Sequence, residues 1–287
     1  MITTEIYKLF SRIKKHSEMR FKDITSDIDE KLKSISLSGS HRRFLVARLG
    51  STGSSWLAKL LNSHPEVFCE HEGILKKIYP RKDFGPEDIT EFILTVAHNT
   101  HHNAYKAAGD VGSVSLSHII QLPEGLITKA LLIRHPARML FTKISNIHPK
   151  TLSKFKENLN KPNETIVQEA LKKEWGIDDS RFEDMDRIFL RNAYRWVAQL
   201  KRAQKFNLII IKIEDMNEVE YAGDILSKLT GVEYEKSLIG WMANKRENVR
   251  AKKFESINDL MKEFHTQQCE WYKLMVYEDA EKIGYLH

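Results

Sequence analysis

The stretch Phe44–Glu72 reads FLVARLGSTGSSWLAKLLNSHPEVFCEHE, and it predicts a strand, a tight loop and a helix in direct succession. It opens with the apolar run Phe44–Ala47, which has the length and composition of a buried strand. Small residues occupy 50–55, and an amphipathic run begins at Trp56. This order directs the free N–H groups at the start of a helix toward the loop, where they favour a bound phosphate. The stretch is therefore a candidate anion site, with an unliganded strand-to-helix turn as the alternative.

The loop departs from the phosphate-binding loop of nucleotide kinases. That loop requires Gly-x-x-x-x-Gly-Lys-Ser/Thr, in which the lysine reaches the terminal phosphates. Here Gly50 and Gly53 are too close together, and serine rather than lysine follows Gly53. A kinase of related loop architecture is therefore an alternative that the sequence disfavours, and magnesium-dependent use of ATP would support it.

The composition is that of a globular protein with room for a large core. The chain has 287 residues, of which 41% are hydrophobic and 29% are charged, and its net charge is +6. A mild basic excess suits an anionic small ligand, whereas nucleic-acid binding usually requires denser basic clusters. The two cysteines are too few for a disulfide framework or a cysteine-based zinc site. Without an apolar run of ~20 residues or a signal-peptide pattern, we expect a cytoplasmic protein.

The rest of the chain predicts an α/β fold. Residues 1–40 read as a helical N-terminal extension that is basic and amphipathic, which favours packing on the domain or on a partner over a peripheral membrane contact. Residues 41–287 read as one α/β domain, in which the charged and irregular segment 150–185 resembles a lid or substrate-side insertion. A closing helix is expected over 256–282. Alternation of apolar strands with helices predicts a doubly wound parallel sheet, with later strands near 67–72, 105–110, 129–133 and 207–213 and a long helix over 186–205.

A second candidate anion-binding residue follows a later strand. Arg134 comes directly after the apolar run that ends at Ile133. Ligands of open α/β sheets gather at the carboxyl ends of the strands, so Arg134 and the 50–55 loop are expected at one edge. Two such elements suggest a ligand with two separated phosphates, whereas a surface ion pair is the alternative for Arg134 alone. His98, His101 and His102 cluster without the spacing of a zinc site, so no metal is expected.

Taken together, these motifs resemble those of the PAPS-dependent sulfotransferases, most closely the carbohydrate and bacterial-type branch. The family's loop, Arg-Ser-Gly-Ser/Thr-Ser/Thr-Trp-Leu, resembles residues 51–57, and its His-Pro-Asp-Val-Phe segment resembles 64–68. An Arg-Asp-Pro motif with a serine eight residues after the arginine is similar to Arg134-His135-Pro136 with Thr142. A Tyr-Glu-Asp-Leu strand end and a terminal Leu-Gly-Tyr resemble 213–216 and 283–285. The matches keep their order from about residue 43 to 285.

The resemblance implies a P-loop-like fold, PAPS as cofactor and adenosine 3′,5′-bisphosphate (PAP) as product. The acceptor would be a hydroxyl of a small molecule, a lipid or a sugar, with no nucleic acid involved. A general base must remove the hydroxyl proton. Glu72 matches the family glutamate and is the first candidate for the base. Glu70 is the second candidate, because it shares one face of the predicted strand with Glu72, and His71 is the third. The implied cofactor-binding residues are Ser51, Thr52, Gly53, Ser54, Ser55 and Trp56 at the 5′ end, with Arg134 and Thr142 at the 3′-phosphate.

Three departures from the family pattern affect the chemistry. Ser51 stands where the loop has its basic residue, so the cation near the 5′-phosphosulfate must come from elsewhere, and Arg48 and Lys106 are the candidates. Val111 replaces a family lysine, and His135 replaces the aspartate after the arginine. A non-catalytic nucleotide-binding module is therefore a further alternative.

Overall fold

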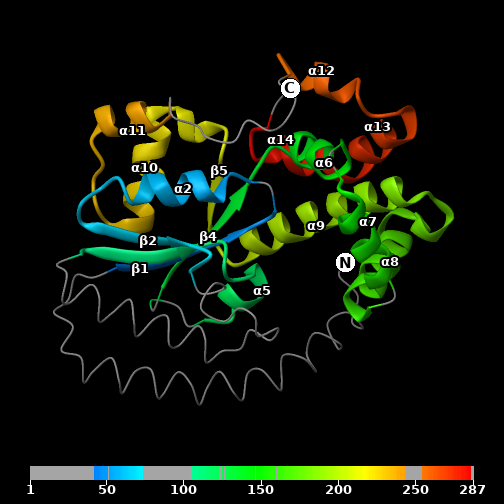
Figure 1. The fold of residues 1–287 in the computed structure, drawn as a ribbon, viewed down its shortest axis with the longest axis horizontal. Coiled ribbons are helices and arrows are strands. Elements are labelled where there is room, and N and C mark those ends of the chain that lie inside the picture. The colour runs from blue at the N-terminus through cyan, green and yellow to red at the C-terminus, as the bar shows by residue number, and fades with distance from the viewer. Residues whose placement is uncertain are drawn as a thin grey trace.

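The computed structural model describes residues 42–50, 52–73, 105–122, 125, 127–145, 147–159, 161–243 and 254–285. The expected N-terminal helix, the three clustered histidines at 98–102 and Ser51 lie outside these residues. Figure 1 shows a twisted sheet with helices on both of its faces. None of the described helices is long and apolar enough to span a membrane.

The sheet is five-stranded in the order β2-β3-β1-β4-β5, and its paired strands are all parallel. This confirms the predicted doubly wound α/β fold. The order places β1 at the centre, between β3 and β4. The strands are β1 (Arg42–Arg48), β2 (Val67–His71), β3 (Ala107–Val111), β4 (Thr128–Ile133) and β5 (Ile209–Lys212).

Both faces of β1 are buried, which explains its continuous apolar run. Phe44 and Val46 pack against a first group of helices on one face of the sheet, and Leu45 and Ala47 pack against a second group on the other face. The first group covers one face with α2 (Ser54–Leu61), α10 (Val219–Thr230) and α11 (Lys236–Ala243). The second contains α5 (Leu116–Ile119), α6 (Pro136–Ser145) and α9 (Asp184–Lys205).

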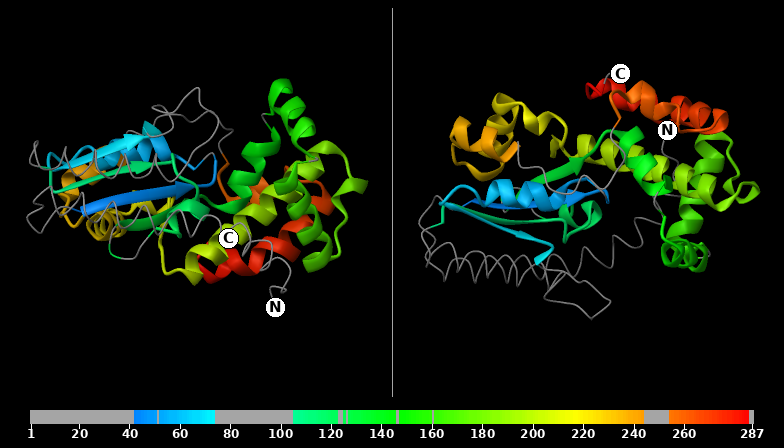
Figure 2. Two further views of the ribbon diagram at one scale, coloured as in Figure 1. Left: turned by 90° about the horizontal axis from the view of Figure 1, so that it is seen from below. Right: turned by 45° about the horizontal axis from the view of Figure 1, so that its top comes forward.

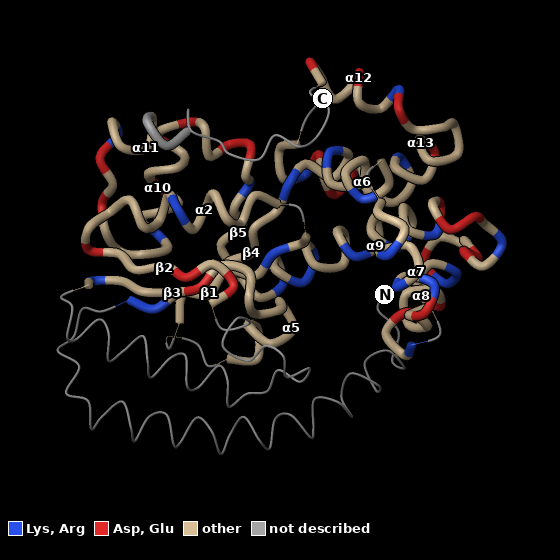
Figure 3. Tube along the Cα trace, in the orientation of Figure 1, with Lys and Arg blue, Asp and Glu red and all other residues tan. Residues whose placement is uncertain are grey.

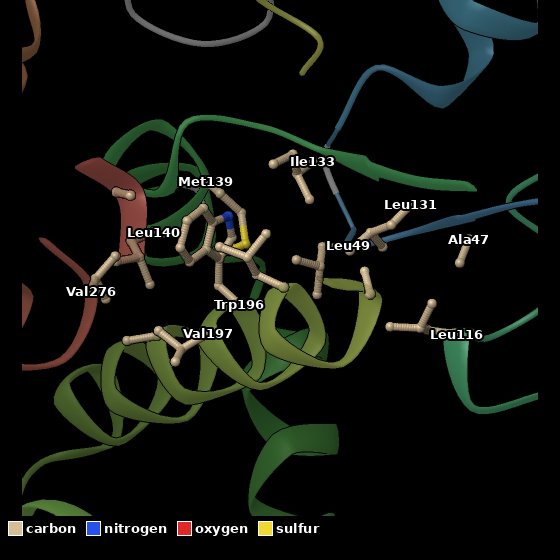
Figure 4. Packing of buried hydrophobic residues seen from close by; sticks show 14 of the residues in the cluster. Ala47, Leu49, Leu116, Leu131, Ile133, Met139, Leu140, Trp196, Val197 and Val276 are labelled. Atoms are coloured by element: carbon tan, nitrogen blue, oxygen red, sulfur yellow. The ribbon is translucent and has the colours of Figure 1, made fainter. Parts of the chain in front are cut away.

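Helix α9 has the predicted inward face. Phe189, Ala193, Trp196 and Leu200 recur at helical spacing, and all four are fully buried. Figure 4 shows Trp196 packed beside Met139 and Leu140 of α6, with Ile133 of β4 close by. The helix therefore anchors the end of β4 and the start of α6.

The expectation that 150–185 is irregular is wrong. It contains α7 (Pro149–Asn158), α8 (Pro162–Trp175) and the short η1 (Asp179–Arg181). Each of the two α-helices has proline in its first turn, and a left-handed Gly176 ends α8. Charges are spread along both helices (Figure 3), which masks the apolar periodicity in the sequence. Val167, Ala170 and Leu171 of α8 are nevertheless buried.

The C-terminal segment differs from the expected single helix by one interruption. A short α12 (Ile257–Met261) is followed by a break, and then α13 (Thr266–Tyr272), η3 (Lys273–Tyr277) and α14 (Glu278–Lys282) run on without a gap. The break ends at His265, whose Nδ1 accepts the N–H of Gln268 and caps α13. Gly284 ends the helix in the left-handed region, as predicted. A short η2 (Asp215–Asn217) follows β5, and a left-handed Gly231 ends α10.

The carboxyl ends of the strands face the helical part of the molecule. In the left view of Figure 2 the arrow of β1 points toward the green and red helices of residues 136–205 and 254–285. The described residues that directly follow β1, β3 and β4 therefore lie toward α6 and α9, and the candidate site lies at this edge.

Candidate anion-binding site

The loop after β1 presents an open helix N-terminus. Gly53 precedes α2 with φ of 79°, a left-handed conformation that suits glycine, and no side chain caps the helix. The Gly53 carbonyl accepts the N–H groups of Trp56 and Leu57, each at 3.1 Å. Within the described part of the chain, the N–H groups of Ser54 and Ser55 have no acceptor. These two donors and the positive end of the helix dipole are available to an anion.

The predicted loop residues divide into accessible and buried side chains. Gly53 is exposed and Ser55 is half-buried, whereas Thr52, Ser54 and Trp56 are buried. The buried hydroxyl of Thr52 has no hydrogen-bond partner among the described residues. An orphaned hydroxyl inside a loop of this kind is a free donor for a bound oxygen. We call Gly50, Thr52, Gly53, Ser54 and Ser55 the loop site.

His71 connects the end of β2 to the loop site. Its Nε2 lies 3.0 Å from the Ser54 hydroxyl and 3.3 Å from the Ser55 hydroxyl. The third-ranked candidate base is thus the one in direct contact with the loop.

Glu72 does not share a strand face with Glu70, and that expectation is wrong. Strand β2 ends at His71, and Glu72 turns away with φ of 54° in the left-handed region. Its carboxylate pairs with the guanidinium of Arg48. Arg48 lies over Gly112, where a Cβ would come within 2.6 Å of the Arg48 Nε. The absence of a side chain at Gly112 therefore lets Arg48 reach across from β1 to Glu72.

Two further carboxylates, one half-buried on β2 and one buried on β3, lie near the ends of their strands. Glu70 has an oxygen, Oε2, that is buried without a hydrogen-bond partner among the described residues. Asp110 of β3 is 1% exposed and accepts the N–H groups of Gly73 at 2.8 Å and Ser113 at 2.9 Å. Asp110 thus holds together the loops after β2 and β3. Sequence reasoning missed this residue, because its role depends on two chain segments that only the sheet brings side by side.

Lys106, one of the two predicted loop cations, is at the wrong edge of the sheet. It precedes β3 and pairs with Glu66, which precedes β2, at 2.7 Å. Since the strands are parallel, both residues lie at the amino edge, away from the loop. A cation that the motifs did not identify, Lys143 of α6, lies beside the loop. Its Nζ lies 2.8 Å from where a Cβ of Gly50 would be. Burial, followed by the charges of Arg195 and Arg48, lowers the pKa of Lys143.

Arg134 directly follows β4, the neighbour of β1, and is held by a network. Its Nε lies 3.8 Å from Glu214 Oε1, and its carbonyl accepts the indole N–H of Trp196 at 3.1 Å. Glu214 also accepts the His135 N–H at 3.2 Å and the Tyr285 hydroxyl at 3.0 Å. Three motifs that lie far apart in the sequence, at 134–136, 213–216 and 283–285, therefore meet at one point.

Helix α6 carries the predicted Thr142 and also a cation, Arg138, that the motifs did not identify. The Thr142 hydroxyl donates to the carbonyl of Arg138 at 2.8 Å, so its hydrogen is directed to its own helix. Arg138 lies near Arg134 and His135. Burial lowers the pKa of both groups and Arg138 lowers both further, whereas Glu214 raises that of Arg134. No carboxylate of the described residues lies within ion-pair distance of Arg138. Its place in the first turn of the helix that follows Arg134 is a sequence signal that could have identified it. We call Arg134 and Arg138 the Arg134 site.

Comparison with known proteins leaves the family open. No family model and no curated protein matches the chain. Among solved structures, it is similar to a crystal structure of mouse sulfotransferase SULT7A1 complexed with PAP. The two are 13% identical, the match covers 85% of each chain, and the TM-score is 0.43. At this identity and TM-score, the likeness by itself identifies neither the ligand nor the reaction of this chain.

Proposed function

We propose that this protein is a sulfotransferase that transfers the sulfuryl group of PAPS to a hydroxyl of a small molecule, a lipid or a sugar. The observation that carries the proposal is the position of two candidate anion-binding elements after neighbouring strands. The loop site follows β1, the Arg134 site follows β4, and the two strands pair in parallel. Both sites therefore open at the same edge of the sheet, where one nucleotide with a phosphate at each end can span them.

The available groups fit such a nucleotide. At the 5′ end, the N–H groups of Ser54 and Ser55 and the orphaned hydroxyl of Thr52 supply donors without acceptors among the described residues. At the 3′ end, Arg134 and Arg138 supply positive charge, and Arg138 has no carboxylate partner in the described part of the chain. When bound, PAPS supplies a sulfuryl group whose bond to the 5′-phosphate breaks as the bond to the acceptor oxygen forms. The N–H donors then stabilise the charge left on the 5′-phosphate.

We assign the general base to Glu72, which follows β2 at the same edge as the loop site. In this role its carboxylate takes the proton of the acceptor hydroxyl. The Glu72 carboxylate must first leave its ion pair with Arg48 before it can contact the acceptor hydroxyl. His71 is the competing base, because its Nε2 lies at hydrogen-bond distance from the loop hydroxyls. Glu70 ranks behind both, since its Oε2 is buried.

The first experiment tests the nucleotide. Thermal and urea unfolding are measured with PAP, with AMP and with ATP plus magnesium. Stabilisation follows the excess of ligand over its dissociation constant, so PAP at a hundredfold excess should add about 2.7 kcal/mol to the free energy of unfolding. Selective stabilisation by PAP supports the proposal. Selective stabilisation by ATP with magnesium, or no effect of any nucleotide, contradicts it.

The second experiment tests the base with radiolabelled PAPS and a broad panel of hydroxyl acceptors. Glu72→Gln is expected to abolish transfer while changing the affinity for PAP by no more than a few-fold. Glu66→Gln, the same change at the opposite edge of the sheet, serves as the matched control. Undiminished transfer by Glu72→Gln together with its loss in His71→Asn would assign the base to His71. Tight PAP binding without transfer to any acceptor would favour a non-catalytic binding module, which the Arg48–Glu72 ion pair also fits.

A further inference from the structure

Lys143 is half-buried at the loop site and is not explained by the motifs that identified the other residues. It lies on the third turn of α6, one residue after Thr142. Its Nζ approaches the backbone of Gly50, because a Cβ there would be 2.8 Å away. Gly50 is thus a position at which the absence of a side chain leaves space for an amino group beside the loop.

Among the described residues, the charges that act on Lys143 are positive. Arg48 and Arg195 are the charged neighbours that act on its amino group. Each of these arginines has its own carboxylate, Glu72 for Arg48 and Glu164 for Arg195. No carboxylate of the described residues lies within ion-pair distance of Lys143 itself. A half-buried ammonium beside two guanidinium groups is costly to the free protein, and a bound anion would remove that cost.

We propose that Lys143 supplies the cation of the loop site, from α6 rather than from the loop, and so binds the 5′-phosphosulfate end of the nucleotide. This inference rests on the proposed function and adds a residue to it. Ser51 stands where the family loop has a basic side chain, and an ammonium from α6 restores the positive charge. The orphaned Thr52 hydroxyl is a second, independent sign that this loop takes an anion.

The position of Lys143 can be tested by comparing two nucleotides. Lys143→Met should weaken PAP about 10- to 100-fold, the loss expected for one charge-assisted hydrogen bond. It should leave adenosine 3′-monophosphate unchanged, because that ligand lacks the 5′ group. Lys143→Arg, which keeps the charge, should recover part of the affinity for PAP. Lys150→Met is the matched control, since it removes an exposed lysine from α7. Equal weakening of both nucleotides by Lys143→Met would overturn the assignment.

Inorganic pyrophosphate separates this inference from the proposed function. If the wild-type protein binds pyrophosphate but not PAP, and Lys143→Met loses pyrophosphate, the loop site stands and the nucleotide is wrong. If the wild-type protein binds neither ligand at millimolar concentration, the inference fails together with the proposed function.

A measurement on the wild-type protein avoids reliance on a substitution. Limiting acetylation followed by mass spectrometry gives the labelling rate of each lysine, and a bound anion blocks the amine that it contacts. Pyrophosphate or PAP should slow the labelling of Lys143 several-fold and leave that of Lys150 unchanged. Equal rates at Lys143 with and without a bound ligand would contradict the proposal.

Discussion

Acidification is expected to destabilise this protein through His135, and His135→Phe should remove that part of the pH dependence. His135 is 5% exposed, its ring packs edge-on against Tyr285 with centroids 5.0 Å apart, and its Nδ1 has no partner among the described residues. Burial, then the charges of Arg138 and Arg134, lowers its pKa from 6.5 to about 4. The folded protein therefore keeps the ring neutral in a range where the unfolded chain protonates it.

The sign and size follow from proton linkage. Between pH 6.5 and about 4 the unfolded chain binds a proton that the folded protein does not, so stability falls as the pH falls. The stability that the neutral His135 ring contributes to the folded protein is fully present above pH 6.5 and is lost as the pH approaches about 4. At 1.36 kcal/mol for each pKa unit, the gap corresponds to about 3 kcal/mol, most of which should be lost by about pH 4.5.

Urea unfolding between about pH 7.5 and pH 4.5 at constant ionic strength measures the effect. Phenylalanine keeps the aromatic contact with Tyr285 but cannot bind a proton. The wild-type protein should lose about 2 to 3 kcal/mol more than His135→Phe across this range. Equal losses in the two proteins, or an imidazole that titrates near 6.5 by NMR in the folded state, would refute the reasoning.

Three other changes have expected outcomes. Asp179→Asn breaks a fully buried ion pair with Arg191, 2.6 Å long, and should lower the free energy of unfolding by about 3–5 kcal/mol in urea titration; a loss below about 1 kcal/mol would contradict this. Gly112→Ala places a methyl group against Arg48 at a residue with φ of 98°. It should lower the free energy of unfolding by about 1–3 kcal/mol in the same assay and weaken the binding of PAP. A variant as stable as the wild-type protein would rule out the close contact with Arg48. Tyr285→Phe deletes the 3.0 Å hydrogen bond to Glu214, which should lower the free energy of unfolding by about 1–2 kcal/mol and weaken the binding of adenosine 3′-monophosphate. Unchanged binding of that nucleotide would show that this hydrogen bond does not support the Arg134 site.

Local patterns were enough to predict the elements that hold the site. The apolar run at 44–47 predicts a strand buried on both faces, and periodicity predicts the inward face of α9. Both depend on neighbours within a few residues, where the chain's own geometry decides which side chains share a face. Helices α7 and α8 were missed because charged residues lie on their exposed faces and interrupt the apolar pattern of 150–185.

The sequence by itself determined that two strand ends carry candidate anion-binding residues, through the loop after β1 and Arg134 after β4. Only the tertiary structure decided which cation reaches the loop. Lys106 is nearer in sequence than Lys143, but it lies at the amino edge of the sheet, whereas α6 brings Lys143 beside Gly50. Likewise, Glu72 takes its left-handed backbone where β2 ends. Its ion pair with Arg48 depends on Gly112, forty residues away in sequence, which leaves space for the Arg48 side chain. Charge interactions act through space, so their partners are chosen by how the strands are ordered and packed and not by spacing along the chain.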